Sequence, residues 1–223
     1  MTDPLAGIVR RWLGGAADDL IAAAIELTEL DARIGDGDHG INLRRGMEAI
    51  TAMLDDADAD AGSADLLRLA GRRLISVVGG ASGPLYGTLL IAMADALGDD
   101  PADAADLARA LEDGVAAVGR RGRSQPGQKT MLDALVPAAA AMASALRSGS
   151  PPADAGRSAA DAARAGRDAT RDMVAQRGRA SYLGERARGH LDPGAASSAI
   201  LVDALHAALV DQPAGSLAAG TSR

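Results

Sequence analysis

The stretch "SADLLRLAGRRLISVV", residues 63–78, shows how most of this chain is built. Its apolar residues recur every three or four positions, as they do along the buried side of an amphipathic α-helix. Three further segments carry the same period, at residues 20–28, 131–146 and 200–208. No segment alternates convincingly between apolar and polar residues with the period of two that a half-buried strand requires. The pattern predicts an all-α fold of about eight helices in one antiparallel bundle or barrel.

Bulk composition indicates one domain and excludes several classes of function. The chain has 223 residues, 48% of them apolar, which suffices for one large core. We expect a single helical-barrel domain over residues 1–210 and a flexible tail over residues 211–223. A net charge of -7 without a basic run, and only three aromatic residues, argue against nucleic acid as a partner. The absence of cysteine excludes disulfides, thiolate metal sites and thiol nucleophiles.

The chain shows no feature of a membrane or secreted protein. Its first residues, "MTDPLAGIVRRWLGG", contain no apolar signal-peptide segment, and no apolar run approaches the length of a membrane span. We therefore expect a soluble cytoplasmic protein with no membrane partner.

Glycine is concentrated in four windows between the helical segments. The windows 35–46, 79–87, 119–127 and 178–194 hold 15 of the 27 glycines in 47 of the 223 residues. Helix ends and turns account for one or two glycines in a loop. Three or four indicate that the backbone comes close to a ligand or offers its N–H groups to an anion.

The densest group of acidic residues lies in "LDARIGDGDHGINL", residues 30–43. Asp31, Asp36 and Asp38 fall within eight residues there, and carboxylates this close repel each other unless a cation lies between them. Their hard oxygen atoms suit Mg²⁺ or Ca²⁺ rather than zinc. An EF-hand is excluded, because a loop begun at Asp31 or Asp36 has no glutamate at its twelfth position. The alternative that Asp38 caps the next helix explains one aspartate and not three.

The other three windows offer groups for an anion. In "VVGGASGPLYGT", residues 77–88, a glycine-rich loop runs into a helix start, which suits phosphate or simply makes a tight turn. It matches neither a Walker A sequence nor a dinucleotide-binding fingerprint. In residues 121–138 the only lysine, Lys129, is either a phosphate contact or a surface residue. The basic stretch 176–201 is either a lid over an anionic ligand or a disordered surface loop.

Four stretches, in order along the chain, resemble the nucleotide-binding L subunit of dihydroxyacetone kinase. The same unit is the C-terminal domain of ATP-dependent single-chain kinases of that family. The stretches are "IGDGDHGINL" (34–43), "GGASGPLYGTLL" (79–90), "PGQKTMLDALVPA" (126–138) and "GRASYLGERARGHLDPGAASSAI" (178–200). Gln128 stands where the family usually has aspartate, so no role is carried over to that position.

The resemblance implies an eight-helix antiparallel barrel that binds nucleotide at one end. It implies two Mg²⁺ ions on Asp31, Asp36 and Asp38. It also implies contacts to ADP or ATP from a larger set of residues, which are His39, Gly40, Ile41, Asn42, Gly80, Ala81, Ser82, Gly122, Met131, Arg179, Asp192, Pro193 and Gly194.

By the same resemblance, the phosphoryl group would pass to dihydroxyacetone, or a related keto-sugar, held on a separate K subunit that supplies the acid–base groups. No catalytic residue is therefore expected in this chain. Tightly bound ADP would serve as a coenzyme that a phosphohistidine protein, the M subunit of the sugar phosphotransferase system, recharges. Three alternatives stay open: exchangeable free ATP as the donor, a regulatory module for a transcription regulator, and a helical protein of purely structural role.

Overall fold

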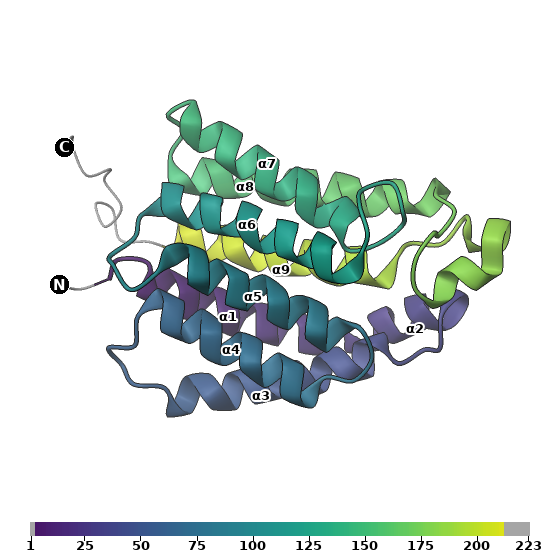
Figure 1. Cartoon of the computed structure of the whole chain (residues 1–223), viewed down its shortest axis with the longest axis horizontal. Helices are drawn as coiled ribbons and strands as arrows, with labels where there is room; N and C mark the ends of the chain where they lie inside the picture. The colour runs from purple at the N-terminus through teal and green to yellow at the C-terminus, as the bar shows by residue number, and fades with distance from the viewer. Residues whose placement is uncertain (1–2, 212–223) are drawn as a thin grey trace.

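The computed structural model describes residues 3–211. All regular secondary structure within this range is helical. Figure 1 shows their arrangement. The α-helices are α1 (Ala6–Ala22), α2 (Ala24–Ile34), α3 (His39–Asp56), α4 (Ser63–Val77), α5 (Ser82–Leu97), α6 (Ala104–Gly122), α7 (Leu132–Arg147), α8 (Pro152–Ala169) and α9 (Pro193–Val210). Two 3₁₀ segments, η1 (Thr170–Asp172) and η2 (Arg179–Ala187), lie between α8 and α9.

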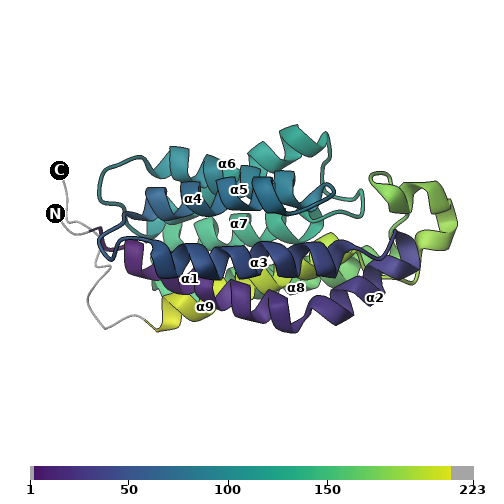
Figure 2. The same ribbon diagram turned by 90° about the horizontal axis from the view of Figure 1, so that it is seen from below.

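Eight of these helices form a closed antiparallel ring. Each helix from α3 to α8 packs against the next helix along the chain. Helix α1 closes the ring through contacts with α3 and α9. The ninth helix, α2, continues α1 after a break at Ala23 and extends beyond the ring toward η2 (Figure 2). The predicted all-α, eight-helix barrel is therefore confirmed, with the periodic segment at 20–28 divided between two helices.

The alternating direction of the helices places every second connection at the same end of the barrel. The connections 35–38, 78–81, 123–131 and 170–192 lie at one end, which we call the loop end (Figure 1). The start of α1 and the end of α9 lie at the other end. The topology thus brings parts of all four glycine windows together.

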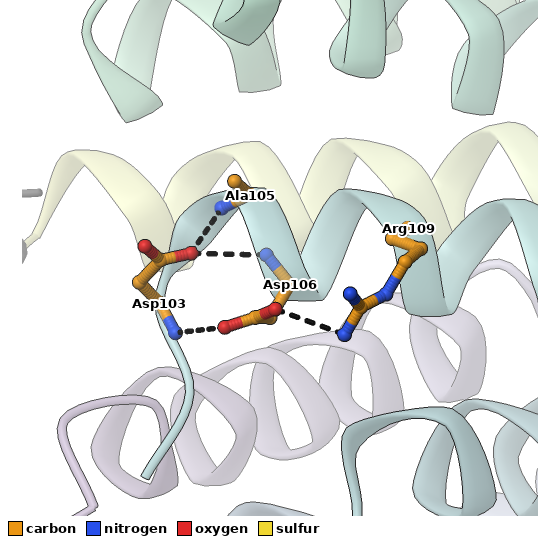
Figure 3. A network of polar contacts seen from close by, with 4 residues as sticks. All are labelled: Asp103, Ala105, Asp106 and Arg109. Carbon is orange, nitrogen blue, oxygen red and sulfur yellow. Dashed lines mark hydrogen bonds and ion pairs between the residues drawn. The ribbon is translucent and has the colours of Figure 1, made fainter. Parts of the chain in front are cut away.

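The core is built mainly from leucine and alanine. Trp12 is buried within it, and its indole N–H donates to the carbonyl of Leu201 (2.8 Å), which links α1 to α9. Away from the loop end, a capping box begins α6. The Asp103 carboxylate accepts the N–H groups of Ala105 (2.8 Å) and Asp106 (3.0 Å), and the Asp106 carboxylate accepts that of Asp103 (3.1 Å) (Figure 3).

The helix α9 corrects one expectation. Among the described residues it alone has the length and composition of a membrane span, with a mean hydropathy of 1.4, whereas the sequence was expected to hold no such run. Its 18-residue window is 67% buried inside the barrel, where α1, α7 and α8 pack against it. Its apolar surface therefore serves the core. Beyond Asp211, the tail expected at 211–223 falls outside the described residues.

Candidate nucleotide and metal site

A cavity of about 470 Å³ opens at the loop end and is lined by residues from all four glycine windows. Of the sixteen residues predicted for the site, thirteen line it. They are Asp31, Asp36, Asp38, His39, Gly80, Ala81, Ser82, Gly122, Met131, Arg179, Asp192, Pro193 and Gly194. A wider hollow of about 600 Å³ lies between the 57–62 loop and α4, away from these loops. We take the loop-end cavity as the site because it alone combines the carboxylates with the glycine-rich backbone.

Three carboxylates converge on one side of this cavity. One oxygen from each of Asp31, Asp36 and Asp38 lies within 4.8 Å of the others. Asp31 belongs to the last turn of α2 and is 9% exposed, whereas Asp36 and Asp38 are exposed. Three hard oxygen ligands with free space beside them suit Mg²⁺, which keeps some of its ligands as water or phosphate oxygens.

Asp31 also holds the start of the next helix. Its Oδ2 atom accepts the backbone N–H groups of Asp38 (2.9 Å) and His39 (3.2 Å). The side chain of Asp38 makes no capping hydrogen bond, so the alternative that Asp38 caps α3 is wrong. Because Asp31 performs the capping, the carboxylate of Asp38 remains available to a cation.

The loop before α5 offers a backbone surface for an anion. Gly80 has a positive φ of 66°, a conformation that other residues adopt at a cost. Ala81 precedes α5, and Ser82 begins it. The first N–H groups of a helix have no partner within the helix. Ser82 and the two residues before it line the same cavity as the carboxylate cluster, and unpaired N–H groups at a helix start suit a metal-bound phosphate.

A buried chain of hydrogen bonds lies beneath the cavity. His39 contacts the Ser82 hydroxyl through Nδ1 (3.0 Å) and the Ser197 hydroxyl through Nε2 (2.9 Å). The Tyr86 hydroxyl contacts those of Ser197 (2.7 Å) and Ser198 (2.9 Å). Burial lowers the pKa of His39, against the opposing effect of Asp31 and Asp38, and it raises the pKa of Tyr86 to about 12.

Asp192, which also lines the cavity, caps α9. It is 8% exposed, and its carboxylate accepts the N–H of Ala195 (2.7 Å). Burial raises the pKa of Asp192 to about 7, and the Ala195 hydrogen bond and the Lys129 ammonium oppose this rise. A carboxylate so close to neutrality is compatible with a neighbouring anionic ligand.

The connection 123–131 forms the remaining wall, and Lys129 within it is only 1% exposed. The alternative that Lys129 is a surface residue is therefore wrong. On the exposed side, Gln128 contacts the stretch before η2: its side-chain oxygen accepts from Arg177 Nε (3.3 Å), and its carbonyl accepts the N–H of Gln176 (3.1 Å).

The stretch 173–191 partly covers the cavity. Its segment η2 is helical, so the alternative of a disordered loop is wrong. Leu183 and Ala180 of η2 pack against a small cluster of Ile34, Ala175 and Ala187, which anchors the segment to α2. Arg179 reaches over the acidic cluster, and its Nε pairs with Asp36 Oδ2 at 2.9 Å.

Three residues implied by the resemblance do not line the cavity. Gly40 lies at the packing of α3 against α2, where a Cβ would collide with the Ala24 carbonyl and the Thr28 side chain. Ile41 is 56% exposed on α3. Asn42 is buried beside Gly79, one residue before the cavity-lining loop.

Sequence reasoning assigned no role to Asp133, Thr170 or Ser197. Each is buried and polar, and each forms hydrogen bonds that shape the cavity wall. None of these residue types is unique in this chain, so nothing in its sequence distinguishes these positions. Tyr86 carried a weak signal as one of two tyrosines.

Comparisons with known proteins agree with this geometry. The family model of the DAK2 domain matches residues 33–207. The ADP-binding subunit DhaL of PEP-dependent dihydroxyacetone kinase 1 from Listeria innocua is 39% identical over 195 residues, 87% of this chain and 92% of the relative. The corresponding ADP-binding subunit from Escherichia coli is 38% identical with the same coverage.

A solved structure has the same fold. The dihydroxyacetone kinase of C. freundii in complex with AMP-PNP and Mg²⁺ superposes with a TM-score of 0.68 at 27% identity. The match covers 93% of this chain and 34% of that longer one. The chain therefore belongs to the DAK2 domain family, as a kinase subunit of the dihydroxyacetone kinase type.

Proposed function

We propose that this chain binds ADP or ATP together with two Mg²⁺ ions and transfers the phosphoryl group to dihydroxyacetone or a related keto-sugar. The acceptor would be held on a separate K subunit. Bound ADP would act as a coenzyme and would be rephosphorylated by a phosphohistidine donor, the M subunit. The cytoplasmic location expected from the sequence stays a prediction.

The observation that carries this proposal is one cavity lined both by three clustered carboxylates and by a glycine-rich helix start. Asp31, Asp36 and Asp38 supply oxygen ligands within 4.8 Å of each other. Gly80 and Ser82 line the same cavity. Phosphoryl transfer depends on positioning and on neutralising phosphate charge more than on covalent participation by the protein. The curated relatives of similar length are named as ADP-binding subunits, which supports the nucleotide assignment.

Each group in the cavity then has a defined task. The carboxylates of Asp31, Asp36 and Asp38 would bind the cations, which supply charge neutralisation when present. The backbone of Gly80 to Ser82 would bind phosphate oxygens, with the Ser82 hydroxyl oriented by His39. Once cations occupy the acidic cluster, the ion pair between Arg179 and Asp36 would break, and Arg179 would contact the nucleotide instead. The segment Asp192 to Gly194 would close the nucleotide site.

The metal assignment is tested with Asp36→Ala and Asp38→Ala. We expect both variants to fold, because Asp38 makes no capping bond and the Asp36 ion pair is exposed, and to lose binding of ADP–Mg²⁺ in titration calorimetry. Asp103→Ala, at the start of α6, is the matched control. Binding equal to that of the unsubstituted chain in both variants would contradict the metal site.

The coenzyme role is tested separately by measuring the nucleotide that stays bound after gel filtration. Retention of about one ADP per chain, with slow exchange against labelled ATP, is the expected result. Rapid and complete exchange would favour free ATP as the donor.

A further inference from the structure

The only lysine in the chain is buried in the wall of the cavity. Lys129 is 1% exposed, and its ammonium donates to the carbonyl oxygens of Thr170 (2.6 Å) and His190 (2.5 Å). Those carbonyls lie 41 and 61 residues further along the chain. A buried ammonium is tolerated only when hydrogen bonds replace its hydration, so these two bonds hold three distant segments at one point.

The two carbonyls belong to segments that are also joined to each other. The Arg171 carbonyl accepts the N–H of Gly189 (2.8 Å), and the Thr170 hydroxyl accepts the N–H of Asp192 (3.0 Å). The segments around Thr170 and His190 together form the part of the cavity wall that precedes α9. Neither of these bonds reaches the connection 123–131. Lys129 makes the buried link to it, whereas the Gln128 contacts lie on the exposed side.

The backbone around Lys129 is fixed in an uncommon conformation. Its φ is +60°, a left-handed conformation that a residue with a side chain adopts only at a cost. The Asp133 carboxylate accepts the N–H groups of Gly127 (2.5 Å) and Thr130 (2.7 Å), one on either side of Lys129. Asp133 therefore maintains the turn that directs the lysine inward, and the next residues, Thr130 and Met131, line the cavity.

We propose that Lys129 is a positioning residue for the nucleotide site. Its ammonium sets the separation between the wall of Thr130 and Met131 and the wall of Asp192 to Gly194. Lys129 then controls nucleotide affinity through these walls without contacting the phosphates. The inference rests on the proposed nucleotide site and adds to it a residue that holds the site in shape.

Because the chain has one lysine, amine acylation followed by mass spectrometry reports on this link without any substitution. Lys129 and the α-amine are the only primary amines, and the reaction of a buried amine follows the fraction of molecules in which its surroundings open. We expect Lys129 in the folded chain to react at least about tenfold more slowly than in the urea-unfolded chain. ADP–Mg²⁺ should slow its reaction further and leave the α-amine unaffected.

The outcomes of the acylation experiment separate this inference from the proposed function. If calorimetry shows that ADP–Mg²⁺ binds and yet the acylation rate of Lys129 is unchanged, the positioning role is overturned and the nucleotide site stands. If no nucleotide binds, both are overturned.

A substitution gives a second, independent measurement. Lys129→Met keeps an unbranched side chain that is one atom shorter and removes both hydrogen bonds, and we expect the Kd for ADP–Mg²⁺ to rise about tenfold or more. Asp103→Ala destabilises the start of α6, away from the cavity, and should leave the Kd unchanged. A Kd for Lys129→Met equal to that of the unsubstituted chain would refute the positioning role. The positioning role would also be refuted if Asp103→Ala, at the same loss of Tm, raised the Kd as much as Lys129→Met does. The Kd would then follow global stability alone.

Discussion

Removal of the Asp31 carboxylate should have two separable effects, on folding and on binding. Asp31 accepts two backbone N–H groups at the start of α3 and belongs to the proposed cation site, whereas Asp38 belongs to the same proposed site without a capping bond. Asp31→Ala and Asp38→Ala each remove one negative charge from the cluster. The difference between their stabilities therefore isolates the two hydrogen bonds of Asp31.

The expected size of this difference follows from the geometry. Loss of a helix cap costs about 1 kcal/mol, and loss of bonds to a charged acceptor costs somewhat more. With two bonds at 2.9 and 3.2 Å and a side chain 9% exposed, we expect Asp31→Ala to be less stable than Asp38→Ala by about 2 kcal/mol. In a chain of this length that corresponds to a Tm lower by about 4–8 °C.

Urea unfolding in EDTA, followed by Trp12 fluorescence, measures this difference without bound cation. Trp12 is the only tryptophan and is 1% exposed, so its emission should report the loss of the core. Calorimetry with ADP–Mg²⁺ should then show that both variants lose nucleotide binding. Equal free energies of unfolding for the two variants would refute the capping role of Asp31.

Two further predictions concern buried polar groups of the site. The folded-state pKa of Asp192, about 7, lies above the ordinary value of 3.8, so its contribution to stability is lost as the pH rises from about 4 through 7. The free energy of unfolding of the unsubstituted chain should fall relative to that of Asp192→Asn over this interval, and parallel pH profiles would contradict the raised pKa. Tyr86→Phe leaves the Ser197 and Ser198 hydroxyls without this partner in the core and should cost about 1–3 kcal/mol of stability in thermal unfolding. The exposed Tyr182→Phe should change stability by less than about 0.5 kcal/mol, and equal effects of the two would count against the buried network.

The fold was predictable because the apolar period of the sequence is long and regular. Once the helices alternate in direction, the meeting of the four loops at one end follows from topology. The break at Ala23 was not predictable, since neither proline nor glycine marks it. The apolar length of α9 was underestimated because its burial depends on contacts with α1 and α7, helices distant in sequence.

The site was predictable to a smaller degree. The spacing of Asp31, Asp36 and Asp38 indicated a cation, and the structure brings their oxygen atoms together. Which of the three caps α3 depends on how the 35–38 loop bends, and local sequence does not determine that bend. The burial of Lys129 was equally hidden, because long charged side chains usually lie on the surface and its partners are carbonyl groups of distant segments.

The alternating topology also determines where another polypeptide can be joined to this one. The start of α1 and the end of α9 both lie at the end of the barrel away from the loop end (Figure 1), and α9 with its 18 residues is about 27 Å long. A partner fused at either position and docked over the cavity needs a connector that runs the length of the barrel, about eight extended residues or more. A short affinity tag at either position would stay clear of the loop end. Insertions between α8 and α9, in contrast, would alter the nucleotide site directly.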